Sequence, residues 1–117
     1  MLTLPSSVKV FLAAGVTDLR KSFDGLSGLA RGALAEDPLS GHLFVFCNRT
    51  RDRLKILYFD GSGLWVFAKR LEKGTFSWPE AGDAARIELR ASELALLVGG
   101  IDLSHTRRRR WYERKPA

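Results

Sequence analysis

This chain contains very little cysteine, histidine or methionine. Cys47 is the lone cysteine, which excludes an internal disulfide. With only His42 and His105 beside it, the chain has too few nitrogen and sulfur ligands for a zinc site. No apolar run approaches the ~18 residues of a membrane span, and no signal peptide is recognisable. We therefore expect a cytoplasmic protein with no metal, no cofactor and no membrane contact.

Length and composition favour one folded domain. The chain has 117 residues, of which 45% are hydrophobic and 10% aromatic, as in a protein with an ordinary core. A chain of this length buries about two thirds of its unfolded surface and can fold without stabilising disulfides or metal ions. We expect a single globular domain over residues 1–103. The segment 104–117 shows no apolar periodicity, and we expect it to be a basic, flexible tail.

The net charge of +6 is unevenly distributed along the chain. Residues 1–48 are neutral overall, and residues 74–103 are acidic. The stretch 49–73 carries seven basic and three acidic side chains, and 104–117 carries six and one. Segregated charge of this kind indicates a partner of opposite charge.

Apolar patterning predicts two helices and several strands. A stripe at steps of three and four residues predicts a main helix over 19–35, with Thr17 or Asp18 as its cap. Glycine at 25, 28 and 32 indicates either close packing of this helix on a sheet or a broken helix. A second, short helix is expected at 91–98. The predicted strands are 8–12, 43–47, 54–59, 64–71 and 84–89, with a possible edge strand at 76–78.

The pair Asp60-Gly61 separates two strand-like runs and is a strong hairpin signal, because glycine accepts the positive φ of a tight turn. The predicted fold is therefore α+β: an antiparallel β-meander of about four to six strands, packed against one main helix and a short C-terminal helix.

Cations accompany the predicted strands and the tail. Arg49, Arg51 and Arg53 would point the same way if their segment were extended. Lys55, Lys69 and Arg70 fall on adjacent strands, where they could bind an anionic partner, pair with Asp60 or Glu72, or shield a sheet edge. In the tail, four consecutive arginines could contact phosphates while Trp111 and Tyr112 stack on bases, although a solvated basic terminus or a protein contact is an alternative.

Catalytic chemistry is not expected. Asp18, Asp24, Asp52 and Asp60 could be imagined as a two-metal site, but a cap and a turn explain two of them. Cys47 on an apolar strand is more typical of a core residue than of a nucleophile.

Three blocks carry a resemblance to a known family. They are Asp18 to Leu26, Pro38 through Gly41 to Phe46, and the stretch from Asp60-Gly61 through 69–74 to Trp78-Pro79. A weaker match covers 100–103 and the arginines that follow. In these blocks the chain resembles the TnpB-type accessory proteins of bacterial IS66 insertion sequences, the product of their second open reading frame. Leu19 and Phe59 depart conservatively from the family's usual Met and Trp.

The resemblance implies a role in transposition beside a separate transposase, with no known chemistry. We expect a non-enzymatic accessory protein that binds DNA at the element ends, transposase or other proteins of the element. The alternative is a protein-interaction module that touches no nucleic acid. The candidate nucleic-acid-binding residues are Arg20, Lys21, Arg49, Arg51, Arg53, Lys55, Lys69, Arg70, Lys73, Arg107, Arg108, Arg109, Arg110 and Trp111.

Overall fold

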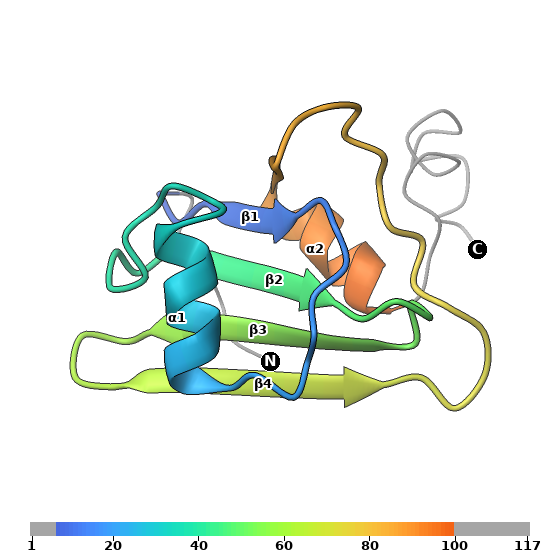
Figure 1. Ribbon diagram of the computed structural model, residues 1–117, viewed down its shortest axis with the longest axis horizontal. Coiled ribbons are helices and arrows are strands. Elements are labelled where there is room, and N and C mark those ends of the chain that lie inside the picture. Colours follow the sequence, from blue (N-terminus) through green and yellow to red (C-terminus); the bar gives the residue numbers. More distant parts are fainter. Residues whose placement is uncertain (1–6, 100–117) are drawn as a thin grey trace, which may run out of the picture.

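The centre of the structure is a five-stranded sheet in the order β4-β3-β2-β1-β5, with one helix on each face (Figure 1). The computed structural model describes residues 7–99. The predicted tail, including Arg107 to Trp111, lies outside the described residues, so its role remains a prediction. Neither helix in the described range is long and apolar enough to cross a membrane.

The predicted α+β fold is confirmed. β2 (Leu43–Cys47), β3 (Arg53–Phe59) and β4 (Leu64–Arg70) form the antiparallel meander. The sheet as a whole is mixed, because β1 (Val10–Ala13) runs parallel to β2 while β5 (Arg86–Leu89) runs antiparallel to β1. The parallel pair follows from the connection between β1 and β2, which carries a helix across the sheet.

The main helix, α1 (Phe23–Arg31), is shorter than the predicted span 19–35. Ser22 is its N-cap residue, so neither Thr17 nor Asp18 caps it. At the other end the chain leaves the helix after Gly32, and Ala35 adopts a φ of 55°. Close packing on the sheet does not explain Gly25: a Cβ there would lie 2.8 Å from the Cβ of Lys21, in the preceding loop.

The core has two parts, one on each face of the sheet. On one face α1 contributes Leu26 and Ala30 to a cluster with Phe44, Phe46 and Leu57. On the other, α2 (Ala91–Val98) contributes Leu94 and Leu97 to a cluster built on side chains that alternate with the first set. Its sheet residues are Val10, Leu12, Leu43, Val45, Cys47, Leu54, Ile56 and Leu89. Strands covered on both faces explain their continuously apolar sequences.

The segment between β4 and β5 contains no strand, so the possible edge strand at 76–78 is not formed. Phe76 is nevertheless buried, and its N–H donates to the Arg51 carbonyl at 2.7 Å. The Trp78 indole N–H donates to the Ala13 carbonyl at 3.0 Å. This loop therefore ties the β2–β3 turn to β1 through anchored aromatic residues.

Candidate functional site

The turn between β2 and β3 is fixed by a network of polar side chains. The Asp52 carboxylate accepts hydrogen bonds from the Asn48 amide (2.8 Å) and the Thr50 hydroxyl (2.7 Å). These two bonds lower the pKa of Asp52, because they stabilise the ionised carboxylate. The Asn48 side-chain oxygen in turn accepts the Arg53 N–H at 3.1 Å. The turn therefore sets where β3 starts and where Arg53 lies.

This geometry separates the three arginines that an extended segment would have aligned. Arg51 has a φ of 60°, and its guanidinium lies 5.2 Å from the centre of the Trp78 ring, where it is half-buried. Arg49 is exposed in the turn and lines a hollow with Asp18 and Leu19. Arg53 is on β3. The segment is thus a turn rather than an extended comb, because the Asn48 and Asp52 bonds close it.

Side chains on the α1 face of the β3–β4 hairpin change in character along the strands. Near the hairpin turn, Leu57 and Val66 are opposite each other and pack into the α1 cluster. At the far end the corresponding positions are Lys55 opposite Ala68 and Arg53 opposite Arg70. The apolar cluster that includes α1 reaches the first pair, and three of the remaining four positions are cationic.

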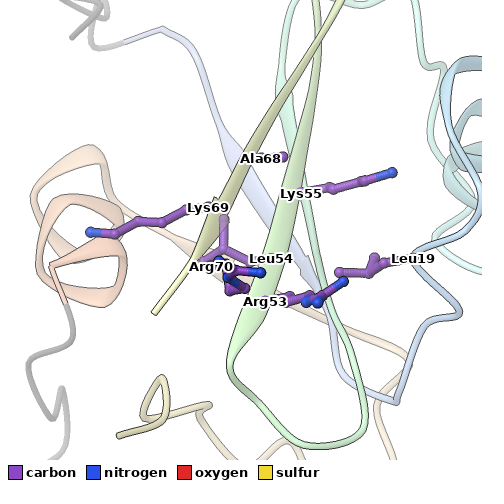
Figure 2. A pocket seen from close by; sticks show the side chains of 7 residues that line it. All are labelled: Leu19, Arg53, Leu54, Lys55, Ala68, Lys69 and Arg70. Atoms are coloured by element: carbon purple, nitrogen blue, oxygen red, sulfur yellow. The ribbon is translucent and has the colours of Figure 1, made fainter. Parts of the chain in front are cut away.

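An open hollow of about 370 Å³ follows this cationic end of the hairpin (Figure 2). We call it the cationic groove. Its lining residues are Leu19, Arg53, Leu54, Lys55, Ala68, Lys69 and Arg70. Leu19 also lines the hollow that contains Arg49, so the two depressions meet at this residue. The structure thus brings Arg53, Lys55 and Arg70 together.

Arg53 and Arg70 are direct cross-strand partners, although like charges in that position destabilise a sheet. The Arg70 guanidinium pairs with the Glu72 carboxylate at 3.3 Å, and the two side chains are 59% and 80% exposed. An ion pair this exposed contributes little to the free energy of folding. The stability of the fold therefore does not explain why both positions are arginine.

Lys55 adds positive charge beside the first turn of α1. Its ammonium donates to the Lys21 carbonyl at 2.9 Å, immediately before the Ser22 N-cap. The N-terminus of a helix carries a partial positive charge of its own. Asp24 in the first turn offsets part of it. Lys21, Lys55 and the helix terminus together make this corner of the molecule favourable for an anion.

Other predicted site residues lie apart from the groove or have partners of their own. The Arg20 guanidinium binds both oxygens of Asp18, the shortest contact being 2.7 Å, which holds the pKa of this carboxyl well below its usual range. Lys69 points to the opposite side, as Figure 2 shows, and donates to the Val98 carbonyl at 2.8 Å. Lys73 is exposed in the loop after β4.

The Asp60 carboxylate is hydrogen-bonded within the β3–β4 hairpin turn. One Asp60 oxygen accepts the N–H groups of Ser62 (2.8 Å) and Gly63 (2.9 Å), and the other accepts the Trp65 indole N–H at 2.7 Å. These bonds, that from Trp65 foremost, lower the pKa of Asp60 far below its ordinary value. Asp60 is thus a turn residue, as predicted. Within residues 7–99, no three His, Cys, Asp or Glu side chains are grouped to hold a metal ion.

Two exposed aromatic residues on β4 are absent from the predicted site. Trp65 and Phe67 are 52% and 36% exposed, with parallel rings 5.8 Å apart. A period of two along Trp65, Phe67 and Lys69 is the sequence signal for a shared face. That signal does not tell whether a helix covers the face. Leu19, at the meeting point of the two hollows, gives no signal of its own.

Comparison with known proteins identifies the family. The chain matches the family model described as IS66 Orf2 like protein over residues 8–108. It is similar to "Uncharacterized protein y4hO" of Sinorhizobium fredii, with 40% identity over 105 residues that cover 90% of each chain. It is also similar to "Uncharacterized protein y4jC" of the same organism, with 36% identity over 102 residues, 87% of this chain and 86% of the relative. No solved structure matches it. The chain belongs to the IS66 Orf2-like family, which associates it with an accessory role in the transposition of insertion sequences.

Proposed function

We propose that this protein is a non-enzymatic, cytoplasmic accessory factor that binds DNA at the ends of its element and presents that DNA to the transposase. Binding would use the cationic groove together with the basic segment 104–117. The observation that carries the proposal is the opposed pair Arg53 and Arg70, which the sheet holds side by side, with Arg70 in an exposed ion pair with Glu72.

The chemistry of these side chains favours phosphate. Guanidinium groups donate two parallel hydrogen bonds to phosphate oxygens, and each neutralised phosphate releases condensed counterions. The groove is an open depression rather than an enclosed cavity, which suits an extended backbone better than a small molecule. Arg49 in the adjoining hollow would lengthen the same cationic track.

The proposal includes no catalytic step, because three of the four candidate carboxylates already have structural partners. Asp18 binds Arg20, Asp52 closes the β2–β3 turn, and Asp60 closes the β3–β4 turn. A nuclease would need converging carboxylates that are free to bind metal ions.

A protein-interaction module is the second candidate function. The exposed stacked pair Trp65 and Phe67 favours it, because aromatic residues are enriched at the centres of protein interfaces. The two candidates use different faces of the hairpin, so variants can separate them.

The test is the salt dependence of binding to duplex DNA carrying the element ends. Arg53→Gln with Arg70→Gln should lower the slope of log affinity against log salt by about 2, since each phosphate contact contributes about 0.9. Lys9→Gln with Arg31→Gln is the matched control: it removes the same charge from exposed positions that do not line the groove.

The control should leave the slope nearly unchanged. Deletion of 104–117 should lower it by several units, because that segment carries six basic side chains. Equal slopes for the groove variant and its control would reject the groove as the DNA surface. No binding to any duplex would favour the protein-interaction module.

A further inference from the structure

β4 is a long strand at the edge of the sheet. It spans seven residues, whereas β5, at the opposite edge, spans four. Within residues 7–99 only β3 pairs with β4, so one side of its backbone has no strand partner there. Natural sheets protect such edges because unpaired N–H and C=O groups recruit another strand.

The register of the hairpin identifies which backbone groups face outward. The Asp60 N–H donates to the Gly63 carbonyl at 3.0 Å, and the Leu71 N–H donates to the Asp52 carbonyl at 2.8 Å. Hydrogen-bonded and non-hydrogen-bonded pairs alternate along an antiparallel ladder. The residues of β4 whose N–H and C=O groups point away from β3 are therefore Leu64, Val66, Ala68 and Arg70.

The α2-side face of β4 has an unusual order of side chains. Trp65 and Phe67, exposed and stacked, occupy its first half, and Lys69 follows on the same face. Arg70 follows at the strand end, on the opposite face. Half of the strand is thus apolar and half is cationic, with Phe67 at the midpoint.

We propose that β4 pairs antiparallel with β4 of a second copy of this chain, in the register that places Phe67 opposite Phe67. This register uses the full length of the strand, and its hydrogen-bonded pairs join only residues whose N–H and C=O groups point outward: Val66 with Ala68, and Leu64 with Arg70. It also places Trp65 opposite Lys69 of the second copy. A cation beside an aromatic ring is attractive, whereas a register that opposed Lys69 with Lys69 would be repulsive.

A second copy fits this edge because the sequence of β4 is complementary to its own reverse. Apolar and cationic halves meet their opposites only when the partner strand has the same order and runs antiparallel. Phe67 lies on the two-fold axis as a non-hydrogen-bonded pair, in which side chains approach most closely. Such an isologous contact closes after two copies.

The dimer has a consequence for the cationic groove. In an antiparallel edge pairing the two-fold axis is perpendicular to the sheet, so α1 of both copies lies on the same side. The two grooves would then share one face of a continuous sheet. The dimer itself does not depend on the DNA proposal, and its test contains no DNA.

The first experiment measures self-association by sedimentation equilibrium of the full chain. An edge contact is small, so dimers should form at micromolar or higher concentration, and added salt should strengthen them by screening the cations. Ala68→Pro removes an outward N–H and should weaken dimerisation about tenfold to a hundredfold. Ala68→Val retains the N–H and should dimerise like the wild type.

A chain that stays monomeric up to about 1 mM, beyond the range of weak specific contacts, would overturn the proposal. So would equal dimerisation of the Pro and Val variants. Melting of both variants, which should stay close to that of the wild type, verifies that edge pairing and not folding has changed.

The second experiment tests the register by oxidation of single-cysteine variants. Cys47 is fully buried and should not compete. Phe67→Cys should form an intermolecular disulfide rapidly, since residues across the axis lie within the ~7 Å limit for Cα atoms. Ala68→Cys is the neighbouring control; its diagonal separation of about 7–8 Å lies beyond that limit. Faster cross-linking of Ala68→Cys than of Phe67→Cys would overturn the register.

Discussion

On both faces of the β3–β4 hairpin the side chains change from core residues to surface residues, but they do so in different directions. On the α1 face they change along the strands, from apolar Leu57 and Val66 to cationic Arg53 and Arg70. On the α2 face they change across the strands, from buried Ile56 on β3 to exposed Phe67 on β4. One face therefore has a charged end and the other an aromatic edge, and each suits a different kind of partner.

The limit of each helix's packing cluster explains this difference. The cluster that includes α1 takes in the end of the hairpin near its turn, and the cluster that includes α2 takes in β3 but not the aromatic residues of β4. A side chain beyond the edge of either cluster is free to serve a partner. The same strand pattern thus yields core at one position and binding surface at the next.

The largest expected effect compares a phenylalanine on each face. Phe44 is fully buried in the α1 cluster, so Phe44→Ala should lower the free energy of unfolding by about 3–5 kcal/mol. Phe67 is 36% exposed, and Phe67→Ala should lower it by about 1 kcal/mol or less. Urea unfolding of both variants measures the difference. Comparable losses would mean that the α2 face of β4 is core rather than surface.

An intermediate effect is expected at the turn that both faces share. Gly61 has a φ of 102°, so Gly61→Val should cost about 1–3 kcal/mol through backbone strain. Gly63 is the matched control, because no positive φ is found there and a Cβ would meet open space. Thermal melting should show a clear loss for the first variant and little change for Gly63→Val. Equal melting of the two would mean that the turn relaxes without strain.

The smallest effects separate the cations of the two faces. Lys69→Ala removes the bond to the Val98 carbonyl at the end of α2 and should cost about 0.3–1 kcal/mol. Arg53→Ala with Arg70→Ala relieves an opposed like-charge pair and should leave stability within about 0.5 kcal/mol.

A transposition assay in cells gives the second readout for the same variants. The double arginine variant should impair transposition although its melting is unchanged. If it melted far below the wild type, these arginines would be structural and the proposed binding surface would be wrong.

Local patterns predicted most elements of the fold. Asp60-Gly61 predicted the hairpin because only a few residue types accept its turn geometry, and the apolar runs at 43–47 and 54–59 indicated strands. The ends of α1 were less predictable. Asp18 looked like a cap, but Arg20 binds its carboxylate, and the helix begins at Phe23 instead. Whether a side chain caps a helix depends on which groups it contacts in the folded protein, and sequence spacing alone does not decide that.

The candidate site was predictable as a set of charges but not as a surface. Arg53 was predicted in a connecting segment and Lys55 on the next strand; the structure places both on one side of β3, where they meet Arg70. The predicted alignment of Arg53 with Arg51 failed, because a positive φ and the Trp78 ring turn Arg51 inward. Lys69 and Arg70 are adjacent in sequence, and adjacent strand residues necessarily face opposite sides of the sheet.

By itself, the sequence determined the family, the α+β class, the hairpin and the concentration of positive charge in 49–73 and 104–117. Each of these depends on residue types at short spacing. The tertiary structure alone decided that β1 joins β2 in parallel, that Arg53 faces Arg70 beyond the α1 cluster, and that Trp65 and Phe67 remain exposed. The physical reason is that burial depends on which distant elements cover a residue, and local pattern does not encode where a helix stops covering a sheet.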